Sequence, residues 1–199
     1  EFQDLGHQII LLIGDFTAQV GDPSGRMMSR KPLSPEKIKE NMKEYTKQAG
    51  KILDIKKAEI RYNSEWYGKK TMDFVMDITS RFTVARLLER DDFQKRLKKD
   101  IDISLQEIYY PLMQGYDSVA LKADVEIGGT DQKFNLVFGR KVQKKYEMPQ
   151  QDVLTTPLLI GTDGEVKMSK SIGNYIKITE PSQEMFGKIM SIPDQLMWH

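Results

Sequence analysis

Residues 9–13 read IILLI, an apolar run that ends at Gly14. A run without the polar alternation of a half-exposed strand is typical of a parallel strand that is covered on both faces. It is also far shorter than the roughly 20 residues that a helix needs to cross a bilayer. This segment therefore favours an α/β protein with a doubly wound parallel sheet.

The rest of the chain alternates between predicted helices and strands. One helix begins at Pro35 with Ser34 as its N-cap, and its apolar positions, spaced by three and four, run to Leu53. Beyond it we predict a short strand (58–68), helical segments (71–115), a strand (122–129), a helix capped by Thr130 (130–146), a strand (152–161) and a last helix (181–190). The βα alternation supports a parallel sheet, and residues 71–115 form a helical insertion in it.

Charge and composition restrict the classes of function. The 30 basic and 29 acidic residues leave a net charge of +1, so any site for a polyanion must be local. The sequence has no cysteine and two histidines, which excludes disulfides and thiolate metal sites and leaves little room for an imidazole cluster. Since no signal peptide opens the sequence, we expect a reducing, cytoplasmic location.

The stretch GDPSGR (21–26) is a candidate ligand loop. Its glycines allow a tight turn beyond the carboxyl end of a strand, where ligands bind in open α/β sheets, and Asp22 would point into that crevice. The alternative is a plain turn in which aspartate and proline serve geometry alone. Arg26 and Arg30 follow on a basic stretch that either folds over phosphates or is simply solvated.

Tyr110, Gln114 and Asp117 are spaced i, i+4 and i+7, so they share one face of a predicted helix. Polar groups in a row beside Leu112 and Met113 suggest a pocket that binds the hydrogen-bonding groups of a small ligand. The alternative is an amphipathic helix with its polar side in water.

Gly128 and Gly129 end a predicted strand directly before a helix start. The glycines permit close approach of a ligand, and the helix start offers free N–H donors to an anion or a ribose. The spacing matches neither the Rossmann dinucleotide fingerprint nor the Walker motif.

The loop GEVKMSKSIGN (164–174) carries Lys167 and Lys170 between two glycines, with Ser169 and Ser171 as further donors. If the loop curls, both ammonium groups can reach one polyphosphate. A solvated lysine-rich surface is the alternative.

KMSKS at 167–171 matches the signature of class I aminoacyl-tRNA synthetases letter for letter. Together with GDPSGR, YYPLMQGYD and IGGTDQKFN in this order, the sequence resembles the catalytic domain of bacterial tyrosyl-tRNA synthetases over essentially all of its residues. The resemblance implies an α/β, Rossmann-like doubly wound parallel sheet with a helical insertion (about 71–115) and a KMSKS loop (163–174). The second signature of the class, of HIGH type, is absent, so we expect that the sequence begins after the first βα unit and stops before the anticodon-binding region.

The resemblance also implies roles in tyrosine binding. Asp22, Tyr110 and Gln114 would hold the ammonium group of tyrosine, and Asp117 would accept its phenolic hydroxyl. Gln132 would lie beside the tyrosine carboxylate and the reacting phosphate.

Further roles concern ATP, which would bring Mg²⁺ with it. The implied contacts are Gly128, Gly129 and Asp131 to the ribose, Leu159 and Ile160 to the adenine, and Lys167, Lys170, Ser169, Ser171, Arg26 and Arg30 to the phosphates. Glu126 occupies a position where other branches of the family carry glutamine.

The implied reaction is attack of the tyrosine carboxylate on the α-phosphorus of ATP, followed by transfer of tyrosine to tRNA(Tyr). Such a reaction needs positioning and charge stabilisation rather than a nucleophilic side chain. Two alternatives remain: a catalytically inactive tyrosine- or nucleotide-binding chain, and a general nucleotidylyltransferase, which would not explain the stripe on 110–117. The segment 71–100 resembles the family's dimer interface, although its apolar residues Phe82, Val84, Leu87 and Leu88 could equally be core.

Overall fold

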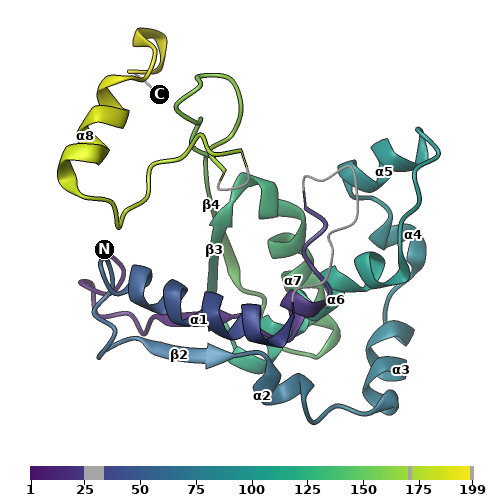
Figure 1. Cartoon of the computed structure of the whole chain (residues 1–199). Helices are drawn as coiled ribbons and strands as arrows, with labels where there is room; N and C mark the ends of the chain where they lie inside the picture. Colours follow the sequence, from purple (N-terminus) through teal and green to yellow (C-terminus); the bar gives the residue numbers. More distant parts are fainter. Residues whose placement is uncertain (25–33, 170–171, 198–199) are drawn as a thin grey trace. The chain divides into compact units, whose positions relative to one another are not determined.

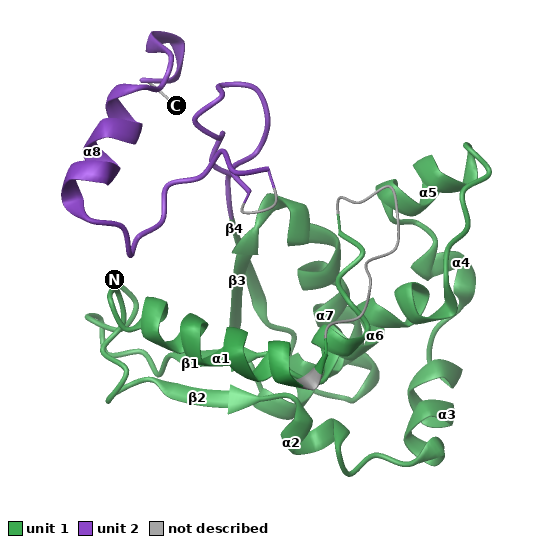
Figure 2. Ribbon diagram, viewed as in Figure 1, with its two compact units in different colours: residues 1–155 green, residues 156–199 purple. Residues whose placement is uncertain are grey.

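The computed structural model describes residues 1–24, 34–169 and 172–197. The chain forms two compact units, residues 1–155 and residues 156–199, which are coloured separately in Figure 2.

Short strands alternate with helices along the chain (Figure 1). In chain order the elements are β1 (Ile10–Ile13), η1 (Thr17–Gln19), α1 (Pro35–Ala49), β2 (Glu59–Tyr62), α2 (Ser64–Tyr67), α3 (Met72–Ser80), α4 (Val84–Leu87), α5 (Asp91–Leu97), α6 (Leu105–Leu121), β3 (Val125–Gly129), η2 (Thr130–Gln132), α7 (Lys133–Lys145), β4 (Asp152–Thr156), α8 (Ser182–Met190) and η3 (Asp194–Leu196), where η marks a short 3-10 helix. Residues 71–115 are helical as predicted, in α3 to α6, with breaks around Arg81 and Asp100. A further break separates α4 from α5 within the segment predicted as one helix, and α6 continues beyond residue 115 to Leu121.

The strands confirm the α/β class. β1 and β2 are parallel, with Ile10 opposite Glu59 and Ile13 opposite Tyr62, and β3 pairs with β4, so the described strands form two two-stranded sheets. The expectation that this strand is covered on both faces is wrong, because only Ile13 of β1 is buried and its other three residues are half-buried.

Two predicted helix boundaries need correction. Ser34 caps α1 as expected, since its hydroxyl accepts a hydrogen bond from the Lys37 backbone N–H over 3.3 Å, but the helix ends at Ala49 instead of reaching Leu53. Thr130 does not cap α7, because it starts the 3-10 turn η2 and α7 begins three residues later.

The core of the first unit lies around α6 and α7. Its buried side chains are Ile78, Leu87, Leu112, Phe138 and Val142, and Phe82 packs against them. Leu87 and Phe82 therefore belong to the core of the chain itself, whereas Val84 remains 59% exposed.

A buried ion pair fixes the start of α6. Arg96 of α5, 1% exposed, donates to Glu107 over 2.6 Å. Glu107 also accepts from the Ser104 backbone N–H, and the Ser104 hydroxyl accepts from the Glu107 backbone N–H, which completes a capping box. The Glu107 carboxylate thus neutralises the buried guanidinium of Arg96 and helps to cap the N-terminus of α6.

Helices of the described residues are all too short or too polar to cross a bilayer.

Candidate functional site

Asp22 and Gln132 come from two motifs that lie far apart in the sequence. Gln132, at the end of η2, donates its Nε2 to Asp22 Oδ2 over 2.7 Å. Asp22 Oδ1 also accepts from the Ser24 backbone N–H, so the carboxylate is held from two sides. The turn at residues 21–24 and the end of η2 therefore meet in the folded chain.

A buried arginine supports this junction. Arg90 is 2% exposed and donates to Ser24 Oγ over 3.1 Å and to Asn135 Oδ1 over 3.0 Å, while Asp92 pairs with it over 2.8 Å. Asn135 in turn donates to Gln132 Oε1 over 3.0 Å. No local pattern in the sequence pointed to this network, because an arginine before a helix is ordinarily a surface residue.

Asp117 lies in α6 and is 5% exposed. Trp66 Nε1 donates to one of its oxygens over 2.9 Å, and Asn63 Nδ2 donates to the other over 3.3 Å. Burial raises the pKa of Asp117 to about 7, against the opposing effect of these donors. A carboxylate whose pKa lies this close to neutrality is typical of functional positions.

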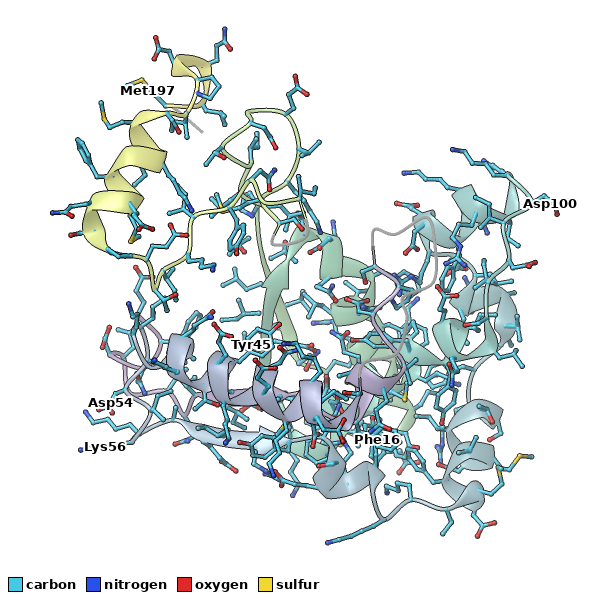
Figure 3. The ribbon with its side chains drawn as sticks, in the orientation of Figure 1. Phe16, Tyr45, Asp54, Lys56, Asp100 and Met197 are labelled. Atoms are coloured by element: carbon cyan, nitrogen blue, oxygen red, sulfur yellow. The ribbon has the colours of Figure 1, made fainter. Side chains whose placement is uncertain are left out.

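Asn63 links Asp117 to the segment that follows β1. Its Oδ1 accepts from the backbone N–H of Phe16, which is labelled in Figure 3, and its Nδ2 also donates to Thr17 Oγ1 over 3.0 Å. The residue is fully buried. Asn63 directly follows β2, so its place at the carboxyl end of a parallel strand was the signal that could have identified it from the sequence.

Tyr110 and Gln114 share α6 with Asp117, as their spacing predicted, and both are half-buried. The stripe is therefore not the solvent-facing side of an amphipathic helix. Gln114 Nε2 donates to Glu126 Oε1 over 3.2 Å. Among the described residues, hydrogen bonds join Asp22 to Gln132 and Ser24, and to neither Gln114 nor Asp117.

Gly128 and Gly129 are the last residues of β3, and Asp131 follows in η2. A Cβ on Gly128 would stand 3.2 Å from Leu136 Cδ1, so the glycine lets the strand lie close to α7. Asp131 lines a groove of about 490 Å³ between charged side chains of α5 and α7, which include Lys95, Lys133 and Lys141.

The lysine loop belongs to the second unit. Ile160 and Lys167 form an antiparallel bridge, and the Met168 backbone N–H donates to the Leu159 carbonyl over 2.7 Å. The Leu159 and Ile160 side chains are 67% and 39% exposed, so both are accessible on this hairpin. Its turn is stabilised by Asp163, whose pKa is lowered mainly because the carboxylate accepts from the Glu165 backbone N–H.

Asn174 organises the same loop from inside. The residue is 7% exposed; its Oδ1 accepts from the Ser169 backbone N–H over 2.8 Å, and its Nδ2 donates to Asp163 Oδ2 and to the Lys167 carbonyl. The backbone that carries Lys167 and Ser169 is thus held by one amide. The four other predicted phosphate ligands lie outside the described residues: Arg26, Arg30, Lys170 and Ser171.

Within residues 1–24, 34–169 and 172–197, the structure has no cluster of three or more acidic or histidine side chains that could hold a metal ion.

A family described as tRNA synthetases class I (W and Y) has a sequence model that matches residues 1–199. The chain is 58% identical over 198 residues to a tyrosine–tRNA ligase of Ralstonia nicotianae, covering 100% of the chain and 50% of that protein. It is 59% identical over 197 residues to that of Carboxydothermus hydrogenoformans, covering 99% of the chain and 48% of that protein. The chain thus spans about half the length of the curated relatives it matches.

Solved structures of tRNA synthetases share the fold of this chain. The tyrosyl-tRNA synthetase of Archaeoglobus fulgidus, complexed with L-tyrosine, is 30% identical with a TM-score of 0.72, over 94% of this chain and 56% of that one. A tryptophanyl-tRNA synthetase of Campylobacter jejuni is 20% identical with a TM-score of 0.69, over 96% of this chain and 59% of that one, and so supports the fold alone. Since the family's sequence model matches every residue and its solved members share the fold, the chain belongs to the class I tRNA synthetases of the tryptophan and tyrosine group.

Proposed function

We propose that the protein carrying this sequence activates tyrosine with ATP and transfers it to tRNA(Tyr), and that this chain forms the core of its catalytic domain. The observation that carries the proposal is the stripe on α6, where a buried carboxylate, Asp117, lies one to two turns from the half-buried Gln114 and Tyr110. The names of the relatives that are more than half identical support tyrosine over tryptophan as the substrate.

In this proposal Asp117 binds the phenolic hydroxyl of tyrosine. Its oxygens accept side-chain hydrogen bonds from Trp66 and Asn63, and the Tyr67 hydroxyl is a third side-chain partner. An ionised carboxylate has about four lone-pair sites, so one remains for a further donor. Phenylalanine would leave this buried acceptor without that donor, which costs binding free energy. The pocket therefore favours tyrosine.

The ammonium group of tyrosine is assigned to Asp22, Tyr110 and Gln114. An ammonium group only donates, so it needs acceptors, and a carboxylate supplies the strongest. Gln132, which already donates to Asp22, is assigned to the tyrosine carboxylate and the reacting phosphate. Its position beside Asp22 suits a zwitterion, whose two charged groups are separated by one carbon.

For ATP, the residues assigned to the ribose are Gly128, Gly129 and Asp131, and those assigned to the adenine are Leu159 and Ile160. The phosphates are assigned to Lys167, Ser169, Lys170 and Ser171, with Arg26 and Arg30 assisting. These residues stabilise charge on the leaving pyrophosphate, and Mg²⁺ would arrive with the nucleotide.

Two further features belong to the proposal. We infer a homodimer from the likeness of residues 71–100 to the family's dimer segment, with the exposed Val84 as its apolar contact. A cytoplasmic location remains a prediction from the cysteine-free sequence.

The decisive experiment is ATP–pyrophosphate exchange on the full-length protein that carries this sequence. We expect exchange that depends on tyrosine and charging of tRNA(Tyr). Exchange driven by tryptophan, with none driven by tyrosine, would overturn the assignment.

A further inference from the structure

Glu126 lies at the centre of a polar cluster on β3. Its Oε1 accepts from Gln114 Nε2 over 3.2 Å, and its Oε2 accepts from Ser118 Oγ over 3.0 Å and from Gln151 Nε2. Gln114 and Ser118 are one turn apart on α6. The carboxylate thus links a strand, a helix and the segment before β4.

The cluster is closed by packing. Ser118 and Gln151 are 3% and 1% exposed, and the Gln151 backbone N–H donates to Gln143 Oε1 of α7 over 2.7 Å. A Cβ on Gly139 of α7 would stand 2.8 Å from Gln151 Nε2 and 3.4 Å from Glu126 Oε2. Because donors and backbone surround Oε2, the carboxylate has one orientation and Oε1 must face Gln114.

This orientation decides which end of the Gln114 amide faces the ligand. An ionised carboxylate only accepts hydrogen bonds, so the amide group of Gln114 must turn its NH₂ towards Glu126. The carbonyl oxygen of the same planar group then points away from Glu126. If the amide were inverted, its NH₂ would point there instead and would repel an ammonium group.

We propose that Glu126 is a positioning residue of the amino-acid site, which fixes the Gln114 amide with its oxygen towards the α-ammonium group of the substrate. This inference rests on the proposed function, in which Gln114 binds that group. It makes Glu126 responsible for selecting ligands that carry an ammonium group, without contact between Glu126 and the ligand.

Glu126→Gln tests the proposal with almost no change in shape. Two donors, Ser118 and Gln151, keep the oxygen of the new amide on the Oε2 side, so its NH₂ takes the place of Oε1. That NH₂ needs an acceptor, and the Gln114 amide must therefore invert. The double variant Gln114→Glu with Glu126→Gln restores an acceptor, because the new carboxylate at position 114 accepts from position 126 and from the ammonium group alike.

The measurement is the dissociation constant, by calorimetry on the full-length protein, of L-tyrosine and of 3-(4-hydroxyphenyl)propionate, which lacks the ammonium group. In Glu126→Gln, tyrosine should bind about ten-fold more weakly while the analogue stays within about two-fold, since one acceptor to a charged group is lost. The double variant should return tyrosine affinity to within about three-fold of the wild type on the same reasoning. The ratio of the two constants within one variant does not depend on how much of that variant is folded.

If Glu126→Gln bound both ligands more weakly by the same factor, or bound tyrosine as tightly as the wild type, the role of Glu126 would be overturned while the proposed function stayed in place. If the double variant is as weak for tyrosine as Glu126→Gln, the inversion is also refuted. A wild-type protein that binds neither ligand would instead refute the proposed function itself.

Discussion

Gln132 Nε2 and Asp22 Oδ2 are 2.7 Å apart, although 110 positions separate the two residues in the sequence. The contact holds a carboxylate at the position where the proposed site would bind the ammonium group of tyrosine. Preorganised charge of this kind reduces the free energy that binding must spend on ordering the site.

Asp22→Asn removes the charge and keeps the size. We expect the KM for tyrosine in the exchange reaction to rise about ten- to one-hundred-fold, because a charged hydrogen bond to the ammonium group becomes a neutral one. The KM for ATP should change little. Asp4→Asn, at an exposed aspartate near the N-terminus, is the matched control, and an unchanged tyrosine KM in Asp22→Asn would contradict the assignment.

Asp117→Asn should change how stability depends on pH. Burial raises the pKa of Asp117 from 3.8 to about 7, whereas the unfolded chain ionises near 4. Between these values the folded state holds a proton that the unfolded state has lost, so the free energy of unfolding falls as the pH rises from about 4 to about 7. The free energy of unfolding of the variant does not fall in this way. Relative to the wild type it should therefore rise by up to about 4 kcal/mol as the pH rises across that range.

Urea denaturation at four pH values between 4.5 and 7.5 measures this difference. Parallel curves for the two proteins would show that Asp117 titrates in the folded state as it does in the unfolded chain.

Trp66→Phe keeps most of the ring and removes the Nε1–H that donates to Asp117 over 2.9 Å. That donor stabilises the ionised carboxylate, so its loss should move the pKa of Asp117 above about 7. NMR titration of the labelled carboxyl carbon would report the change. A lower pKa in the variant would be the contrary result.

Glu107→Gln tests the buried ion pair. Arg96 would keep its charge at 1% exposure without a carboxylate partner, and the loss of one member of a buried pair destabilises by about 3–5 kcal/mol. Glu40→Gln, in the exposed pair with Lys37, should cost less than about 0.5 kcal/mol. Chemical denaturation of both variants measures their free energies of unfolding. Similar losses of stability in the two variants would argue against a structural role for the Arg96–Glu107 pair.

Asn174→Ala should loosen the lysine loop of the second unit. The alanine can neither accept from the Ser169 backbone N–H nor donate to the Lys167 carbonyl. We expect trypsin to cleave after the lysines of this loop about ten-fold faster, since local opening becomes easier, and the KM for ATP to rise. Asn41→Ala in α1 controls for the substitution, and unchanged cleavage in Asn174→Ala would contradict the holding role of the amide.

Much of the local structure could be read from the sequence. The apolar run before Gly14 predicted a parallel strand, and β1 pairs in parallel with β2. The i, i+4 and i+7 spacing placed Tyr110, Gln114 and Asp117 on one helix, which is α6. These features depend on residues a few positions apart, whose geometry the backbone periods fix.

Tertiary structure alone decided the environment of each polar group. Burial raises the pKa of Asp117 and outweighs the hydrogen bonds from Asn63 and Trp66, which lie more than 50 positions away. The orientation of Gln114 follows from Glu126, a half-buried residue that the sequence marked only as a departure from relatives. Burial and charge pairing arise when distant segments pack together, so no local pattern carries them.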